Sequence, residues 1–439
     1  MIQINRSGKT GLLMVLPLIL FFSCKKEEFE GQRPDERIAA ALDAYYGTLA
    51  GSEYGWKGNL FPAGGRGFGF FFRFDRQNRV SMLADISDQT RRTAKESSYR
   101  IRATLTPSLY FDTYTYLHQL ADPDPAVNNG TPGFGLYSDF EFSIQYASKD
   151  TLLLKGNLFG SRLELIRATR EEAAAYEAGN LAAMKRRVSQ FLEDRKFTYI
   201  EDAAGNIYTT AIDTEENTLI VNYDSAGTIA TQKFGLSFFG TDQLIMSMPF
   251  RHDKFQFDRL IIDSQTGELQ AAQGGQHFVL WDTEVPPFAF SAMWGVGYES
   301  IVVPIETEAQ GNGAEFNLRR TTFLQNARTL LAAGTTFPEM TVTIDRKQQL
   351  LFVNQLIRQG ANNFNARFVF SFIQQGDEYT FKYEGATDDN AKFLENAFIP
   401  VLEGFLYGKM QFDYDLELSE LRASGQSGGL PGFKFVGRL

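Results

Sequence analysis

The clearest candidates for acid–base chemistry in this chain gather between Tyr110 and Glu141. Five titratable side chains stand out there: Asp112, His118, Asp122, Asp139 and Glu141. A histidine beside carboxylates can pass protons near neutral pH, and a pair of carboxylates can hydrolyse a glycosidic bond. Polar side chains at such places also serve structure, because buried polar groups are normally satisfied within the protein. We favour the structural interpretation, in which His118 hydrogen-bonds a carboxylate and fixes a long loop, and we assign no catalytic residue.

Metal and cofactor sites have little support in the sequence. The three histidines are far apart, none has a second histidine four residues away, and Cys24 is the only cysteine. A zinc site would therefore need all three histidines to converge. The phosphate-binding pattern Gly-x-x-x-x-Gly-Lys-Ser/Thr is missing, and the glycine-rich run 64–69 precedes a strand pattern, which favours a turn. We expect no metal and no cofactor.

Two further groups of residues allow more than one interpretation. Asp122, Asp124, Asn128 and Asn129 place four oxygen-bearing side chains within eight residues, and calcium accepts such ligands. Two prolines interrupt that loop, so an ordinary surface loop is the favoured interpretation. The second group is the three tryptophans, Trp56, Trp281 and Trp294. Each could stack on a sugar ring, but for each we favour a place in the hydrophobic core.

The elements that carry these residues show mainly the two-residue period of strands. A helix is expected from Pro34-Asp35, followed by an antiparallel meander. Its expected strands are 68–74, 80–84, 99–105, 109–117, 140–146, 152–156 and 161–166. Residues 170–196 show the pattern of one long amphipathic helix, with Lys185-Arg186-Arg187 on the solvent side. This basic triplet could contact phosphate or lipid, but a solvated helix face is the favoured interpretation.

Hairpins are predicted again beyond residue 196. Three turns combine a capping aspartate with a glycine that supplies positive φ, namely 202–207, 224–229 and 263–269. Two later helices are expected at about 321–333 and 388–406, the second with a kink or break at Pro400.

Length and composition limit the possible classes of protein. A chain of 439 residues suggests two to four domains, and 43% apolar with 22% charged residues is an ordinary globular balance. Aromatic residues reach 14%, which favours a β-rich fold. The net charge of −10 argues against nucleic acid as a partner.

The first residues predict where in the cell the protein is located. Residues 1–23 have a basic start and a short apolar core, as in a secretory signal peptide. Cys24 follows at once and resembles the lipidated cysteine of bacterial lipoproteins. The next residues, Lys25-Lys26-Glu27-Glu28, resemble the export signal of surface-displayed Bacteroidetes lipoproteins. We therefore expect a lipid-anchored protein of the outer membrane that faces the cell surface, with lipidation at Cys24.

Several segments together resemble a known family. They are Trp56, Gly64-Gly65, Ser98-Tyr99, Leu109–Tyr114 with His118, Asp122-Pro123, Asp139–Phe142 and Leu152–Gly156. In this order they resemble the Bacteroidetes outer-membrane lipoproteins of the domain-of-unknown-function family 4302, over most of residues 35 to 170. The resemblance implies no established activity. Such proteins tend to be encoded beside outer-membrane nutrient-uptake systems, which favours ligand capture over catalysis.

These observations combine into one prediction. We expect a mainly β protein with antiparallel meanders, an N-terminal lipocalin-like barrel or curled sheet, a few amphipathic helices and a second β-rich region. The expected domains are a signal peptide 1–23, a tether 24–34, a β domain 35–169, a connecting helix 170–196 and a β-rich region 197–439, which divides near 285–313. The expected function is capture of a glycan or peptide ligand, or an accessory role, in an outer-membrane uptake complex. The alternatives are a docking subunit without a small ligand and, less favoured, a hydrolase.

Overall fold

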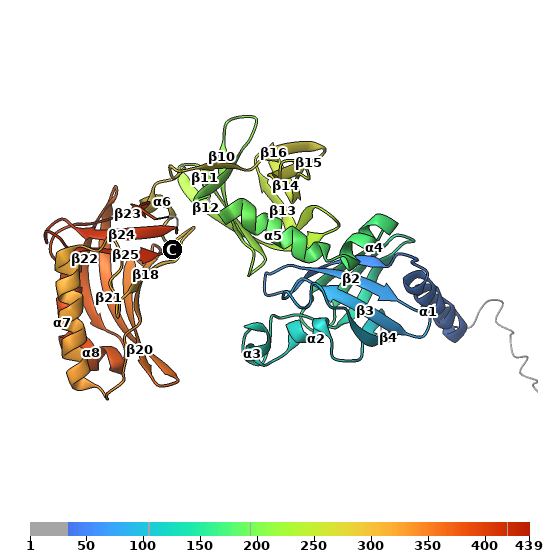
Figure 1. Cartoon of the computed structure of the whole chain (residues 1–439), viewed down its shortest axis with the longest axis horizontal. Coiled ribbons are helices and arrows are strands. Elements are labelled where there is room, and N and C mark those ends of the chain that lie inside the picture. Colours follow the sequence, from blue (N-terminus) through green and yellow to red (C-terminus); the bar gives the residue numbers. More distant parts are fainter. Residues whose placement is uncertain (1–33, 104–105, 194, 419) are drawn as a thin grey trace, which may run out of the picture.

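Three β modules follow one another along the chain (Figure 1). The structure, a computed structural model, describes residues 34–103, 106–193, 195–418 and 420–439. A closed eight-stranded barrel comes first, a nine-stranded sheet second, and another closed eight-stranded barrel last. We call them the first barrel, the middle sheet and the C-terminal barrel. The strands of all three sheets pair antiparallel, so the predicted mainly β fold class is confirmed.

The first barrel is an up-and-down meander that closes where its last strand pairs with its first. Its strands are β1 (Trp56–Phe61), β2 (Phe68–Phe74), β3 (Arg79–Ala84), β4 (Lys95–Ala103), β5 (Pro107–Phe111), β6 (Glu141–Ala147), β7 (Thr151–Gly156) and β8 (Arg162–Arg167). The closing pair runs from Trp56 opposite Arg167 to Phe61 opposite Arg162. The expected first helix is α1 (Pro34–Ala50), and the indole of Trp56 donates to the carbonyl of Leu49 near its end (2.9 Å).

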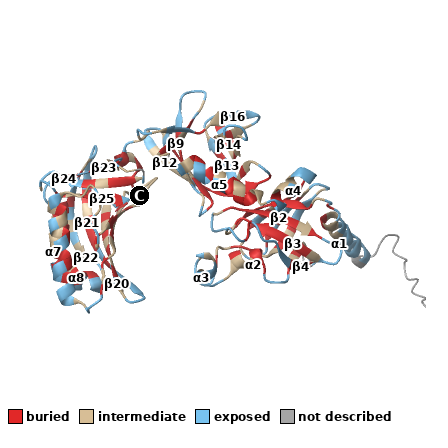
Figure 2. Cartoon of the chain, in the orientation of Figure 1, coloured by how far each residue is buried: buried red, intermediate tan, exposed pale blue. Residues whose placement is uncertain are grey.

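The interior of this barrel is a packed core of aromatic rings. Along β2, Phe70 and Phe72 point inward and stack on each other with ring centroids 5.3 Å apart, whereas Phe71 points outward. Phe111 and Phe142 meet edge to face in the same core. Figure 2 shows the buried residues continuing through the strands of the barrel. The expected barrel is therefore confirmed, and its centre is filled by its own side chains, as in small barrels generally.

The segment after β5 differs from the prediction. A strand was expected over residues 109–117, but β5 ends at Phe111 and a helix α2 (Tyr116–Ala121) follows, then a short helix α3 (Pro125–Asn128). The apolar residues Tyr116, Leu117 and Leu120 are buried at helical spacing. Alternation could not distinguish these two periods over so few residues.

The expected single helix over 170–196 is two helices. They are α4 (Arg170–Glu177) and α5 (Asn180–Glu193), separated by Gly179 at φ +88°. A left-handed glycine ends the first helix and reorients the chain. The basic triplet is also corrected, because Lys185 is buried rather than on the solvent side.

The middle sheet packs against α5 and against the outer face of the first barrel. Its strands are β9 (Phe197–Glu201), β10 (Ile207–Asp213), β11 (Thr218–Ser225), β12 (Thr228–Phe239), β13 (Gln243–His252), β14 (Phe255–Ile262), β15 (Leu269–Gln273), β16 (Gln276–Val279) and β17 (Trp281–Thr283). Phe71 of the first barrel stacks on Tyr176 of α4 within the core of this sheet (4.8 Å). A Cβ atom at Gly69 would lie 2.0 Å from the carbonyl oxygen of Phe238. The first glycines of the run, Gly64 and Gly65, lie in the predicted turn before β2, whereas Gly69 is within β2 and lets β2 and β12 approach each other.

The three predicted hairpin turns are confirmed. Gly205, Gly227 and Gly267 all have positive φ. The carboxylate of Asp263 accepts from the N–H groups of Thr266 and Gln265, which lowers its pKa. Local side-chain chemistry therefore defines these turns.

The C-terminal barrel is covered by two helices, as Figure 1 shows. Its strands are β18 (Ser300–Pro304), β19 (Glu339–Asp345), β20 (Leu350–Gln359), β21 (Asn362–Gln375), β22 (Glu378–Ala386), β23 (Met410–Asp415), β24 (Arg422–Ser427) and β25 (Lys434–Arg438). The helices are α7 (Ala314–Leu330) and α8 (Asp389–Leu402), and a 3-10 turn (Glu403–Phe405) follows α8. The expected helices are present with shifted ends, and Pro400 lies inside the last turn of α8. Among the described residues, none of the helices combines the length and apolarity needed to cross a bilayer.

Candidate binding site

Asp139 is the most deeply buried of the five predicted site residues, and its carboxylate is fully used within the protein. Its oxygens accept from the N–H groups of Leu158, Phe159 and Ser161 at 2.7, 3.0 and 3.0 Å. The hydroxyl of Ser161 donates a fourth bond, at 2.7 Å. A Cβ atom at Gly156 would lie 2.0 Å from Asp139 Oδ2, so this glycine leaves room for the carboxylate. Asp139 therefore ties the 157–161 turn to the start of β6.

His118 lies in the first turn of α2 and caps that helix. The N–H of Thr115 donates to its Nδ1 (3.2 Å), and its ring stacks on Phe140 with centroids 4.3 Å apart. Burial lowers the pKa of His118. The expected structural role is consistent with these contacts, but the hydrogen-bonding partners are the backbone groups of Thr115 and Phe111 and not the expected carboxylate.

Replacing His118 by alanine is expected to lower the free energy of unfolding by about 1–3 kcal/mol at pH 8, because the N–H of Thr115 loses its acceptor. Since the folded state has the lower pKa, this stabilisation is present above the unfolded value of about 6.5 and is lost as the pH falls below it. Urea unfolding at pH 8 and pH 5 measures both effects. The exposed His277 provides the control, with an expected change below about 0.5 kcal/mol for His277→Ala. Equal stability of His118→Ala and the wild type at pH 8 would contradict the structural role.

None of the other three predicted residues forms a hydrogen bond or ion pair with His118 within the described ranges. Asp112 forms an ion pair with Arg100 at 3.0 Å, and Asp122 accepts from the hydroxyl of Tyr114 at 2.5 Å. The Tyr114 hydroxyl and the N–H of Asp124 lower the pKa of Asp122. Glu141 is half-buried at the start of β6. These carboxylates therefore have separate surroundings, which gives the hydrolase alternative little support.

The loop considered for calcium uses its side chains internally. Asp124 caps α3 by accepting from the N–H of Ala126, and the Asn128 amide donates to the carbonyls of Gln119 and Asp122. Asn129 is a left-handed residue that ends α3. Within the described ranges, no group of three or more histidine, cysteine, aspartate or glutamate residues could hold a metal ion.

The remaining sequence candidates have mixed outcomes. Trp56 and Trp294 lie in the core as expected, whereas Trp281 on β17 is 51% exposed, so the core prediction is wrong for it. Sequence reasoning missed one pattern, Gly-x-Ser-x-Gly around Ser427, which is typical of a nucleophile elbow. Ser427 ends a strand, is buried and donates to the Tyr407 carbonyl, while the three histidines belong to the other two modules. The predicted lipidation and export residues, Cys24, Lys25, Lys26, Glu27 and Glu28, lie outside the described residues.

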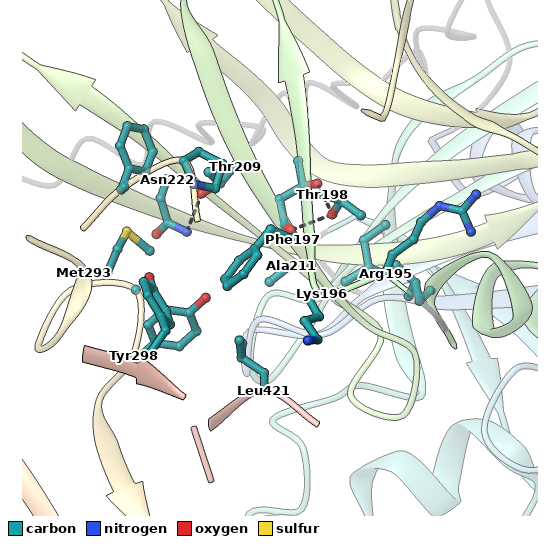
Figure 3. A pocket seen from close by; sticks show the side chains of 17 residues that line it. Arg195, Lys196, Phe197, Thr198, Thr209, Ala211, Asn222, Met293, Tyr298 and Leu421 are labelled. Atoms are coloured by element: carbon teal, nitrogen blue, oxygen red, sulfur yellow. Dashed lines mark hydrogen bonds between the residues drawn. The ribbon is translucent and has the colours of Figure 1, made fainter. Parts of the chain in front are cut away.

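A pocket of about 200 Å³ lies between the middle sheet and the C-terminal barrel (Figure 3). One wall comes from the middle sheet, with Phe197 on β9, Thr209 on β10 and Asn222 on β11. The other comes from the C-terminal module, with Tyr298 before β18 and Tyr414 on β23. The two walls touch, because the rings of Phe197 and Tyr414 meet edge to face at 5.2 Å.

The polar groups of this pocket retain hydrogen-bonding capacity. The Asn222 amide donates to the hydroxyl of Thr209 (3.2 Å) and accepts from that of Thr231 (2.7 Å). The Thr209 hydroxyl hydrogen and the second amide hydrogen of Asn222 can therefore serve a ligand. Arg195 and Lys196 line the same pocket and lie near Asp282 and Glu284, so acidic side chains balance their charge.

The two tyrosines are not suited to acid–base catalysis near neutral pH. Burial raises the pKa of Tyr298 to about 12 and also raises that of Tyr414. The hydrogen bond between their hydroxyls raises the pKa of Tyr414 further. Both therefore stay neutral, as hydrogen-bonding groups with apolar rings, which is typical of a binding surface.

Comparison with known proteins identifies the family. A family model described as a domain of unknown function (DUF4302) matches residues 25–264, more than half of the chain. The chain belongs to this family. The DUF4302 match covers the first barrel, α4, α5 and strands β9 to β14, and it ends in the turn before β15. The pocket thus joins residues inside the matched range, such as Phe197, to residues beyond it, such as Tyr414.

Other comparisons add no functional information on this DUF4302 chain. No curated protein matches it. Among solved structures, the DNA polymerase III subunit beta (DnaN) sliding clamp from Bartonella birtlesii is 7% identical, with 90% of this chain and 97% of that chain covered. The TM-score is 0.13, and a likeness at this level carries no argument.

Proposed function

We propose that this protein captures a ligand and does not transform it, and that the ligand lies in the pocket between the middle sheet and the C-terminal barrel. The observation that carries the proposal is the lining of this pocket, which combines aromatic rings from two modules with free hydroxyl and amide groups of the middle sheet. Such a combination is typical of ligand sites, where a few polar groups orient a ligand against an apolar wall. The titratable residues near His118 support binding over catalysis, because their contacts are structural.

The lining also favours a class of ligand. A sugar ring has C–H groups on its faces and hydroxyls at its edge, so it can lie against Tyr298 and bond to Thr209 and Asn222. Ligand pockets commonly measure about 300–1,000 Å³. At about 200 Å³ this one suits a single sugar unit or the end of a longer chain. A glycan is therefore our first choice, and a short peptide is the second.

A glycan array followed by titration calorimetry tests the site. Thr209→Val removes a hydroxyl that can bond to the ligand and keeps the side-chain shape, whereas Tyr298→Leu removes the aromatic ring against which the sugar lies. Each substitution is expected to weaken binding about tenfold, which is about 1.4 kcal/mol. Trp281→Ala is the matched control, because it removes an exposed aromatic ring outside the pocket and should leave the affinity unchanged. If Trp281→Ala loses affinity while the two pocket variants keep it, the ligand lies on the surface near Trp281. Full affinity in all three variants would exclude this pocket as the binding site.

The cellular location of the protein is part of the same proposal. We propose that a lipid on Cys24 holds the protein in the outer membrane and that Lys25 to Glu28 direct it to the cell surface, where it can serve a nutrient-uptake complex. The short apolar core before Cys24 supports this proposal. A docking role without a small ligand remains the alternative.

Replacing Cys24 by alanine is expected to move the protein from the membrane fraction to the soluble fraction, because the acyl chains provide the membrane affinity. Cell fractionation and immunoblotting measure the change. Protease added to intact cells should remove the wild type. Retention of Cys24→Ala in the outer membrane would show that the anchor is elsewhere, and full protection from protease would place the protein on the inner leaflet.

A further inference from the structure

A buried group of charges lies where the first barrel meets α5 and the middle sheet. Asp85, directly after β3, has a fully buried side chain and accepts from Arg91 Nε at 2.6 Å. Lys185 Nζ on α5 lies 3.8 Å from the same carboxylate, and the Asn217 amide at the start of the middle-sheet hairpin donates to it at 3.0 Å. These residues belong to three parts of the chain, so the network fixes the position of each part relative to the others.

A polar pocket of about 460 Å³ opens beside this network. Its walls are residues of the segment 86–92 of the first barrel and one side of α5, and Glu215 from the turn between β10 and β11 also lines it. The lining includes four basic side chains, Arg91, Arg92, Lys185 and Arg186, and two acidic ones, Asp88 and Glu215. The lining is therefore basic, although the whole chain carries a net charge of −10.

Two of these arginines have no side-chain partner among the residues that the structure describes. Arg91 bonds to Asp85 and Asp88, so its guanidinium is neutralised. Arg92 and Arg186 are exposed, and neither side chain forms a hydrogen bond or ion pair with another residue in the described ranges. Two unpaired guanidinium groups facing one pocket repel each other, and an anion between them would replace this repulsion with attraction. An arginine guanidinium also matches phosphate oxygens through paired N–H donors.

We propose that this pocket binds a phosphate group, held by Arg92 and Arg186 with Lys185 Nζ behind them. Ser87 and Ser189 line the same pocket, and their hydroxyls can supply further donors. The walls come from the first barrel and from α5, so a bound phosphate also links the two. The site is separate from the glycan pocket and goes beyond the proposed function.

The test uses the full-length Cys24→Ala protein, which keeps every residue of the pocket. Titration calorimetry with inorganic phosphate at fixed ionic strength is expected to show saturable binding, and phosphate but not chloride is expected to raise the melting temperature. The double variant Arg92→Gln, Arg186→Gln should bind phosphate at least tenfold more weakly and keep the melting temperature measured without phosphate. Arg76→Gln is the matched control, since Arg76 is an exposed arginine outside this pocket.

Vesicles distinguish a lipid headgroup from free phosphate as the source of this group. If headgroups occupy the site, binding to phosphatidylglycerol vesicles is reduced by the double substitution and by added phosphate. If free phosphate occupies it, vesicle binding is the same for both proteins while phosphate binding differs. The proposal is overturned if the parent protein shows no saturable phosphate binding, or if the double variant binds phosphate as tightly as Arg76→Gln.

Discussion

Replacing Asp85 by alanine is expected to lower the free energy of unfolding by about 3–5 kcal/mol, because it leaves buried Lys185 without its ion-pair partner and leaves buried Arg91 with only the exposed Asp88. Arg91 stays charged at any relevant pH, and Lys185 would then face only the amide oxygen of Asn217 at 3.2 Å. Burial raises the pKa of Asp85 and lowers that of Lys185, because both side chains are largely removed from solvent. Urea or thermal unfolding of the purified protein measures the change.

Asp88→Ala is the matched control for this prediction. Asp88 pairs with the same arginine at 2.7 Å, but its side chain is 87% exposed, and exposed ion pairs contribute less than about 1 kcal/mol. The two variants therefore separate burial from charge pairing. If Asp85→Ala unfolds at the same denaturant concentration as Asp88→Ala, the junction between the first barrel and α5 does not depend on this carboxylate.

Local signals in the sequence were sufficient for much of the fold. The turn at Asp263 and Gly267 depends on residues within a few positions of each other, so its pattern could be read directly. The alternation along residues 140–146 likewise gave the strand β6 within one residue at each end. Periodicity failed where a short helix had few turns, as at Tyr116–Ala121, and where one residue, Gly179, divided a long apolar stripe.

Long-range contacts explain the other differences. Lys185 was expected in solvent because its neighbours Arg186 and Arg187 are basic, but its partner Asp85 is 100 positions earlier in the chain. The proposed glycan pocket combines Phe197, Asn222 and Tyr414, which share no motif. Their common environment depends on how two modules meet, and composition, spacing and family resemblance do not contain that information. The predicted cluster near His118, by contrast, lies in one short segment of the chain. Its carboxylates form several hydrogen bonds and ion pairs with other residues of the first barrel.

Asp139→Ala is the second variant with a large expected effect, and it distinguishes a structural carboxylate from a catalytic one. Its four donors, the N–H groups of Leu158, Phe159 and Ser161 and the hydroxyl of Ser161, would lose their acceptor together. Hydrogen bonds to a charged group contribute about 1.5–3 kcal/mol each, and water entering the site would recover part of the loss. We expect the free energy of unfolding to fall by about 3–5 kcal/mol, measured by urea unfolding.

Glu141→Ala provides the comparison, because Glu141 lies two residues further on and its carboxylate forms no hydrogen bond or ion pair within the described ranges. Its substitution should change the free energy of unfolding by less than about 0.5 kcal/mol. A catalytic pair would give a different pattern, in which both variants fold normally and both lose turnover.

Gly156→Ala tests the same carboxylate in another way. Because Gly156 leaves space for the Asp139 carboxylate, a methyl group at residue 156 should displace this carboxylate and lower the stability as Asp139→Ala does, although every hydrogen-bond donor remains. Normal stability of Gly156→Ala and Asp139→Ala together would reopen the hydrolase interpretation of this segment.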